Sequence, residues 1–335
     1  MKTYHCSKSN FVEQLEVLER RLESNDIRSN EISMALRQEL AGIKGQNALR
    51  FPLEVAPFHK SVIAINNPRI QDKHGYFEID TLILAPNYIL LLEVKNWYGT
   101  LYIDEDRQFI RKGDDGLAEG MPNPISQVWL QRHRLENWLK ARGILQEMPI
   151  MYFVVIGFSS TIIKPFQTHQ PIPPEVIHSN RLPHEVSQLE EKYPKSLTSK
   201  RDLVMAARAI LRSHIVKEIN VLEHFHVEPH EIRNGVFCLA CNTLGMRYHY
   251  GKWHCVACKY AAADAHLHSL RDYQLLFGPS VKNAEARAFL NLNSPDVIRR
   301  LLTEASLEAA GAKKQRTYLL KPPAELVPER QMRIK

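Results

Sequence analysis

The sequence lacks any apolar run of about 18 residues, the length that a membrane-spanning helix needs. Its first residues, MKTYHCSKSNFVEQ, lack the apolar core of a secretory signal peptide, and no internal repeat is present. Cysteine is scarce, at 5 of 335 residues. We therefore expect a cytoplasmic protein with no membrane partner, in which thiols stay reduced and paired cysteines indicate a metal site rather than a disulfide.

The overall composition is that of a globular protein. Hydrophobic residues make up 44% and charged residues 24%, which excludes wholesale disorder. A chain of 335 residues fits two or three domains. Lysine and arginine outnumber aspartate and glutamate by 44 to 37, for a net charge of +7 and a pI near 9.1. This excess of positive charge favours a polyanionic partner, with nucleic acid ahead of an anionic membrane.

Apolar spacing predicts two amphipathic helices between residues 8 and 45. One stripe consists of Phe11, Leu15, Leu18 and Leu22, and a second of Ile32, Leu36 and Leu40. The helices either pack within the chain or form a surface for a homo-oligomer.

Strands and helices then alternate, which predicts an α/β domain with a mixed sheet flanked by helices. The strands are expected at 62–65, 77–85, 88–97, 100–104 and 151–159, with helices at 125–142 and about 201–222. A segment rich in proline, serine and histidine, 165–200, reads as a loop or linker. The expected organisation is N-terminal helices (1–36), a nuclease-like domain (37–165), linker and helix (166–230), zinc ribbon (231–263), a helical module (264–320) and a tail (321–335).

The most informative segment is GYFEIDTLILAPNYILLLEVKNW, residues 75–97. If Pro86 and Asn87 form a two-residue turn, Asp80 lies opposite Glu93 on one face of the hairpin. Lys95 shares that face because strand side chains alternate. Facing carboxylates repel unless a cation lies between them, and their oxygens suit Mg²⁺ or Mn²⁺.

A metal ion with a lysine beside it could activate water and offset charge during phosphodiester hydrolysis. Two alternatives remain open. The E-V-K sequence could form an exposed cross-strand ion pair, or Lys95 could pair with Glu78, which the same register places opposite it.

The segment GYFEIDTLILAPNYILLLEVKNWYGTLYID and the stretch NPISQVWLQRHRLENWL (123–139) resemble the nuclease-related domain, NERD, of the PD-(D/E)XK phosphodiesterase superfamily. The resemblance runs from roughly Gly42 to Ser160. It implies a restriction-endonuclease-like core in which Asp80, Glu93 and the backbone carbonyl of Val94 hold the metal. It also implies that Lys95 lies beside the nucleophile and that Gln127 contacts metal-bound water or nucleic acid. Gln127 could instead be a capping or surface amide.

The sequence departs from the family at one position. The family usually has a Gly-Glu pair on its first helix, whereas this chain reads GIKGQNALRF, with Gln46 in the place of the glutamate. A neutral amide is a weaker ligand for a hard cation. The departure implies lower metal affinity, replacement by Glu39 or Glu54, or a domain that kept its fold without its chemistry.

Two C-x-x-C knuckles predict a Zn²⁺ site. Cys238 and Cys241 are separated by thirteen residues from Cys255 and Cys258, which is close to the usual four-cysteine spacing. The surrounding cations and aromatics, among them Arg247, Lys252 and Trp253, could hold phosphates and stack on bases. The segment resembles the topoisomerase-type zinc ribbons that bind DNA.

The C-terminal module resembles a winged helix-turn-helix. A helix that starts near Pro295 carries Arg299 and Arg300 opposite its apolar side, and GAKKQRTYLL (311–320) follows as a basic hairpin. Arg299 and Arg300 would lie on the reading helix, with Lys313, Lys314 and Arg316 on the wing. The alternative is a helical cap with a solvated basic face.

These features together predict a divalent-metal-dependent nuclease that acts on DNA. Two other functions stay open, namely a non-catalytic DNA-binding or regulatory protein and a partner-binding adaptor.

Overall fold

The computed structural model describes residues 1–58, 61–113, 116–167, 171–312 and 315–326, which divide into two compact units. Unit 1 comprises Met1–Ser9 and Gln38–Glu218, and unit 2 comprises Asn10–Arg37 and Ile219–Lys335. Helix α2 (Ser29–Asn47) begins in unit 2 and ends in unit 1. Segments 1–36 and 166–230 were each predicted as one part, but both are divided between the two units. None of the described helices is long and apolar enough to cross a membrane.

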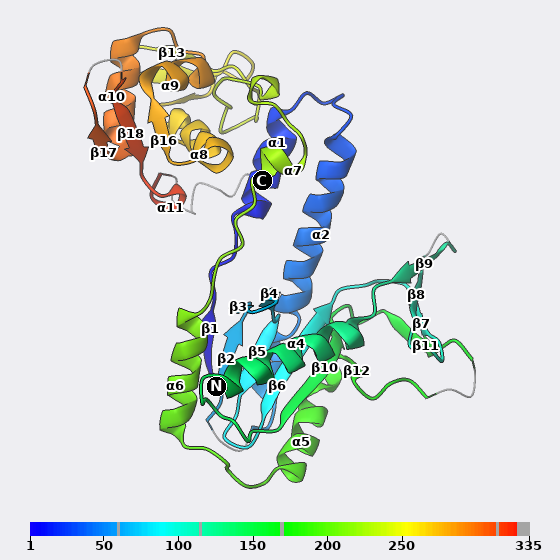
Figure 1. The fold of residues 1–335 in the computed structure, drawn as a ribbon. Helices are drawn as coiled ribbons and strands as arrows, with labels where there is room; N and C mark the ends of the chain where they lie inside the picture. Colours follow the sequence, from blue (N-terminus) through cyan, green and yellow to red (C-terminus); the bar gives the residue numbers. More distant parts are fainter. Residues whose placement is uncertain (59–60, 114–115, 168–170, 313–314, 327–335) are drawn as a thin grey trace. The chain divides into compact units, whose positions relative to one another are not determined.

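A six-stranded mixed sheet forms the centre of unit 1, as Figure 1 shows in the lower part of the view. In sheet order its strands are β1 (Lys2–His5), β2 (Ile63–Asn66), β5 (Thr81–Leu84), β6 (Ile89–Lys95), β10 (Ile150–Ile156) and β12 (Val176–His178). The neighbours β2, β5 and β6 are antiparallel, whereas β1 on one side and β10 and β12 on the other join in parallel. This confirms the predicted mixed α/β architecture.

Helices cover both faces of the sheet, which is why its central strands are apolar at nearly every position. On one face, α4 (Pro124–Lys140) and α6 (Lys200–Arg212) pack against the odd-numbered side of β6, including Ile89 and Leu91. On the other face, α3 (Arg50–Val55) and α5 (Leu182–Lys192) pack against Leu90 and Leu92. Glu93 and Lys95, the next odd-numbered residues of β6, therefore lie on the side of the strand that faces α4.

The predicted hairpin register is confirmed. Leu82 pairs with Leu91 and Leu84 with Ile89, and the Ala85 N–H donates to the Tyr88 carbonyl at 3.0 Å across the Pro86-Asn87 turn. Strand β5 ends at Thr81, so Asp80 is the residue just before it. Asp80 thus lies at the end of β5, beside the end of β6 that carries Glu93.

Smaller sheets complete unit 1. A hairpin consists of β3 (Arg69–Asp72) and β4 (Gly75–Glu78). A four-stranded sheet consists of β11 (Ile162–Pro165), β7 (Thr100–Ile103), β8 (Phe109–Lys112) and β9 (Ala118–Met121). The segment read as a loop, 165–200, instead contains β12 and α5. Its proline and histidine residues hid the helical spacing of Leu182, Val186 and Leu189, which are buried.

Unit 2 has its own hydrophobic core, to which the N-terminal helices contribute. The first stripe, from Phe11 to Leu22 on and just after α1 (Phe11–Arg21), is buried there together with Ile32 and Leu36. The first stripe and the first two residues of the second are therefore used for packing within the chain, whereas Leu40 is exposed. The other helices and strands are α7 (Val221–His224), β13 (Arg247–His249), β14 (Lys252–His254), β15 (Ala261–Ala262), α8 (Ala265–Phe277), β16 (Ser280–Lys282), α9 (Asn283–Leu290), α10 (Pro295–Ala305), β17 (Ser306–Ala310), β18 (Thr317–Leu320) and α11 (Pro323–Leu326), with short 3₁₀ turns at Ser179–Arg181 in unit 1 and Pro229–Glu231 here.

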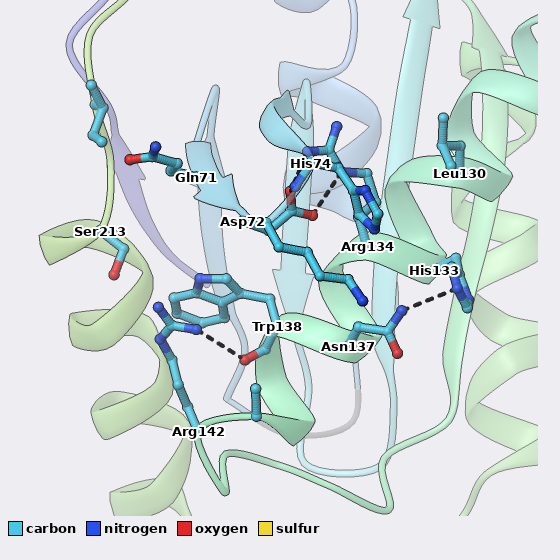
Figure 2. Close-up of a pocket in the computed structure, with 13 residues that line it drawn as sticks. Gln71, Asp72, His74, Leu130, His133, Arg134, Asn137, Trp138, Arg142 and Ser213 are labelled. Atoms are coloured by element: carbon cyan, nitrogen blue, oxygen red, sulfur yellow. Dashed lines mark hydrogen bonds and ion pairs between the residues drawn. The ribbon is translucent and has the colours of Figure 1, made fainter.

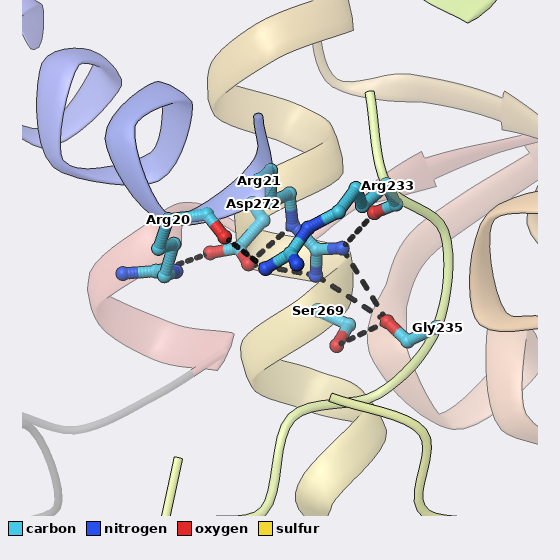
Figure 3. Close-up of polar contacts among 6 residues, drawn as sticks. All are labelled: Arg20, Arg21, Arg233, Gly235, Ser269 and Asp272. Atoms are coloured by element: carbon cyan, nitrogen blue, oxygen red, sulfur yellow. Dashed lines mark hydrogen bonds and ion pairs between the residues drawn. The ribbon is translucent and has the colours of Figure 1, made fainter. Parts of the chain in front are cut away.

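A buried arginine joins α1 to α8, as Figure 3 shows. Arg21 is fully buried, and its Nε donates to Oδ2 of Asp272 at 2.8 Å. The Arg21 guanidinium also donates to the Arg233 carbonyl at 2.9 Å, and Arg20 forms a second ion pair with Asp272. A buried ion pair tolerates no unpaired member. These contacts therefore fix the first helix to the C-terminal half of the sequence.

The C-terminal module consists of helices followed by a hairpin. Strands β17 and β18 are antiparallel, and β16 pairs with β18 on the other side. Ser294 caps α10 by accepting from the Val297 N–H at 3.4 Å, with Pro295 in the first turn. The predicted helix start near Pro295 and the following hairpin are thus both present. Lys313 and Lys314 lie outside the described residues.

Candidate metal and nucleic-acid site

The Asp80 carboxylate lies against the end of β6. Its Oδ2 accepts a hydrogen bond from the backbone N–H of Val94 at 2.8 Å, which holds it beside Glu93. The backbone of Asp80 is held as well, because its carbonyl accepts from the Asn67 N–H at 3.0 Å. Glu93 is only 3% exposed, on the side of β6 that faces α4. The structure therefore brings together the two carboxylates that the sequence placed opposite each other.

Lys95 and Gln127 complete the predicted group. The Lys95 Nζ donates to Oε1 of Glu93 at 2.7 Å and to Oε1 of Gln127 at 2.9 Å. Glu78, the alternative partner, lies on β4 opposite Arg69 of β3. Lys95 thus pairs with Glu93 along its own strand.

Helix α4 places Gln127 because its start is fixed by a cap. The Asn123 side chain accepts from the Ile125 N–H at 2.9 Å and the Ser126 N–H at 3.1 Å, and Pro124 opens the helix. Gln131, one turn further on, is buried and donates to Oε2 of Glu93 at 3.0 Å. Sequence reasoning missed Gln131, although its spacing of four from Gln127 on a predicted helix was the available signal.

Gln46 contacts the site directly. Its Nε2 donates to Oδ1 of Asp80 at 3.2 Å and to Oδ1 of Asn67 at 2.8 Å, while its Oε1 accepts from Nζ of Lys8 at 2.6 Å. Glu39 and Glu54, the proposed substitutes, are exposed. Among the described residues no third His, Cys, Asp or Glu side chain joins Asp80 and Glu93. Lys8 carried no sequence signal, since 38 residues separate it from Gln46.

Gly45 lets the end of α2 approach this closely. A Cβ at this position would lie 2.8 Å from Cβ of Asn96 and 3.4 Å from Cγ1 of Val94. The neighbouring Gly157 is less tightly constrained, since its Cβ would lie 3.2 Å from Gly45 Cα. Because both residues lack a side chain, Gln46 comes within hydrogen-bonding distance of Asp80.

The electrostatics of the site favour a cation. Burial, followed by the charge of Glu93, raises the pKa of the Asp80 carboxyl above its ordinary value, and the Val94 N–H, Lys95 and Gln46 oppose that rise. Two carboxylates that are costly to ionise together are stabilised either by a shared proton or by a bound cation.

The donor set fits a hard divalent ion. The Lys95 carbonyl accepts from the N–H of Gly157, the residue just after β10, at 2.9 Å. Successive carbonyls of a strand point to opposite sides, so the Val94 carbonyl points toward Asp80. Two carboxylates and one carbonyl, all oxygen ligands, match Mg²⁺ or Mn²⁺. A cavity of about 660 Å³, lined by Asp80, Gln46 and Lys8 among others, opens beside these groups.

The four cysteines of unit 2 also converge. Cys238 lies 3.6 Å from Cys258, and Cys241 lies 3.6 Å from Cys255, measured between sulfurs. All four sulfurs lie within 4.8 Å of one another. Four thiols at this separation could hold one tetrahedral ion, and zinc is the ion that such sets bind.

The other predicted nucleic-acid residues of unit 2 fall into two groups. Those that are exposed are Arg247, Lys252, Arg299, Arg300 and Arg316. Trp253 is a correction, because its ring is 1% exposed and its Nε1 donates to Nδ1 of His266 at 3.2 Å. This indole is part of the core of unit 2 and cannot stack on a base.

An acidic pair with an adjacent lysine at the end of a β-hairpin is the arrangement that the resemblance to nuclease-related domains implied. The family model of the nuclease-related domain matches residues 41–157, a range that contains Asp80, Glu93, Lys95 and Gln127. No curated protein matches the chain, and no solved structure does either.

Proposed function

We propose that this chain is a divalent-metal-dependent nuclease that hydrolyses phosphodiester bonds in DNA. One observation carries the proposal. The end of α2, the β5–β6 hairpin and the start of α4 bring together two hydrogen-bonded sets, Gln46 with Asp80 and Glu93 with Lys95 and Gln127. The two sets meet at the end of β6, where Asp80 accepts from the Val94 N–H. Residues so far apart in sequence need not meet for folding alone.

Asp80, Glu93 and the Val94 carbonyl would hold Mg²⁺ or Mn²⁺. Such an ion polarises a phosphoryl oxygen and lowers the pKa of a bound water. Lys95, positioned by Glu93 and Gln127, donates to the attacking water and offsets charge that develops on the phosphate. Gln131 keeps Glu93 oriented from the buried side.

Unit 2 would bind the nucleic acid. Arg300 of α10 donates to the hydroxyl of Tyr248 on β13 at 2.7 Å, so the cysteine hairpin and the reading helix form one surface. Arg299 and Arg316 line a cavity of about 540 Å³ next to it. With Zn²⁺ on the four cysteines, this surface presents a zinc ribbon beside a winged helix-turn-helix, which is suited to phosphate contacts.

A non-catalytic DNA-binding protein is the second candidate, and Gln46 favours it. Both oxygens of Asp80 already accept hydrogen bonds from the chain, and both oxygens of Glu93 do so as well. A site satisfied in this way is stable without a metal. Each carboxylate oxygen has a second lone pair, however, so the hydrogen bonds leave room for coordination.

The decisive experiment is nicking of supercoiled DNA by the full chain in Mg²⁺ or Mn²⁺. We expect Glu93→Ala and Lys95→Ala each to lower the rate by roughly 10²-fold or more. Glu191→Ala on α5 and Lys44→Ala on α2 remove the same charges at exposed positions and should leave the rate unchanged.

Cleavage that survives both site variants would exclude this site as its source. Salt-sensitive DNA binding without cleavage would establish the second candidate. The absence of both activities would favour an adaptor.

A further inference from the structure

A second cavity of unit 1, with a volume of about 1190 Å³, lies further along α4 than the carboxylates. Its walls are the C-terminal half of α4, the turn between β3 and β4, and the residues just after α6, as Figure 2 shows. The Asp80 group does not use this cavity.

The cavity carries net positive charge. Lys73, Arg134 and Arg142 line it together with one carboxylate, Asp72. Arg134 neutralises that carboxylate through two hydrogen bonds, of 2.8 and 2.5 Å, and also donates to the Tyr76 carbonyl at 3.0 Å. Asp72 and Arg134 are thus paired with each other. Lys73 and Arg142 are therefore the positive charges of the cavity that remain to bind an anion.

Trp138 points to a ligand with hydrogen-bond acceptors. The residue is 2% exposed, and its Nε1 has no hydrogen-bond partner among the described residues. Figure 2 shows this nitrogen on the side of the ring that faces Gln71 and Ser213. A buried N–H without a partner is rare and costly, and a carbonyl or ring nitrogen entering the cavity would satisfy it.

Arg142 lies over the same ring, with its guanidinium carbon 4.1 Å from the Trp138 centroid. Its one hydrogen bond to the described residues, in which it donates to the Trp138 carbonyl, is long at 3.5 Å. The face of the Arg142 guanidinium is thus held against the Trp138 ring, while the N–H groups at its edge can donate hydrogen bonds to a ligand. A stacked cation above a buried donor matches the two ends of a nucleotide, which are phosphate and base.

Helix α4 relates the cavity to the carboxylate group. Gln127 and Trp138 lie on one helical face, and their separation of eleven positions corresponds to about 16 Å along the helix. Stacked nucleotides advance about 3.4 Å each, so this span covers no more than about five nucleotides. We propose that the cavity binds a nucleotide of the substrate strand a few positions from the cleaved bond, with Trp138 on the base and Arg142 and Lys73 on the phosphate. This inference rests on the proposed nuclease function only where it identifies the ligand as part of a DNA strand.

The test measures binding without cleavage. Full-length protein carrying Glu93→Gln is titrated in EDTA with fluorescent thymidine oligonucleotides of two and eight residues and with thymidine monophosphate. We expect Arg142→Ala and Trp138→Phe each to weaken binding of the octamer roughly fivefold to tenfold. Arg142→Ala should also reduce the slope of log affinity against log salt by about 0.7, whereas Trp138→Phe should leave it unchanged. The dimer is too short to reach both sites and should bind more weakly than the octamer.

Arg208→Ala, an exposed arginine on α6, is the matched control and should bind like the parent. Octamer binding that neither variant weakens, or that Arg208→Ala weakens as much, would overturn the inference. Variants that weaken thymidine monophosphate but not the octamer would also overturn it, since the cavity would then serve a free nucleotide. Loss of octamer binding in a protein that never cleaves DNA would uphold the cavity while refuting the nuclease. Arg142 is exposed, so its variant tests the idea even if Trp138→Phe folds poorly.

Discussion

Restoring the family glutamate by Gln46→Glu should make stability depend on metal. The change replaces a donor that lies 3.2 Å from Oδ1 of Asp80 by a negative oxygen. Two unit charges at that distance repel by about 5 kcal/mol at an effective dielectric constant of about 20. Lys8, 2.6 Å from the outer oxygen of Gln46, and charge spreading offset more than half of this. We expect a net loss of about 2 kcal/mol in the free energy of unfolding of metal-free unit 1.

Bound metal should reverse the loss, since a third carboxylate attracts the same cation. By linkage, Mn²⁺ affinity should rise by about tenfold or more, equivalent to about 1.4 kcal/mol. Urea-dependent hydrogen exchange of the β5 and β6 amides reports on unit 1 alone, and titration calorimetry gives the affinity. The control is Gln38→Glu, which adds the same charge at an exposed position of α2. If Gln46→Glu is as stable as the parent in EDTA and binds Mn²⁺ no better, Gln46 does not occupy the metal site.

Three further predictions concern packing and protonation. Gly45→Ala should destabilise unit 1 by about 1–3 kcal/mol through its contacts with Asn96 and Val94, whereas Gly42→Ala on the same helix meets no atom within 4 Å and should stabilise it by up to about 1 kcal/mol in urea unfolding. Arg21→Ala should cost unit 2 about 3 kcal/mol by leaving Asp272 partly unpaired, more than Arg20→Ala, as amide exchange in α8 would reveal; equal costs would refute the role of burial. Burial lowers the pKa of His266 to about 4, below its ordinary 6.5, while Asp264 opposes the shift weakly. Because unfolded His266 then binds the proton more readily, unit 2 should lose up to about 3 kcal/mol as the pH falls from about 6.5 toward 4, and His266→Gln should remove most of that dependence.

The β-hairpin could be predicted from sequence because its signals are local. Pro86-Asn87 fixes the turn, and apolar residues on both sides leave one register that buries them. The opposition of Asp80 and Glu93 follows from that register. The same locality explains the cysteine group, since two C-x-x-C knuckles on one short hairpin can meet in few ways.

The contacts that could not be predicted are those between distant segments. Lys8 reaches Gln46 because the first strand joins β2 in parallel, and strand pairing of that kind has no local signature. Helix α1 belongs to unit 2 because Arg21 meets Asp272, a pair separated by 251 residues. The prediction that Trp253 lies on the surface was wrong for a related reason. Alternation along β14 places Trp253 on one side of the strand, but does not reveal which side faces the core. That side is buried because α8, which carries His266, packs against it.

The Asn-Pro pair before α4 shows how a motif can act through helix phase rather than through contact. Neither side chain hydrogen-bonds a carboxylate of the site; Asn123 and Pro124 fix the residue at which the helix begins. Each residue of a helix is rotated by about 100° from the one before, so a start shifted by one residue would turn Gln127 and Gln131 away from Glu93. The same shift would turn Trp138 and Arg134 away from the second cavity. A single capped turn therefore sets the phase of both ends of α4.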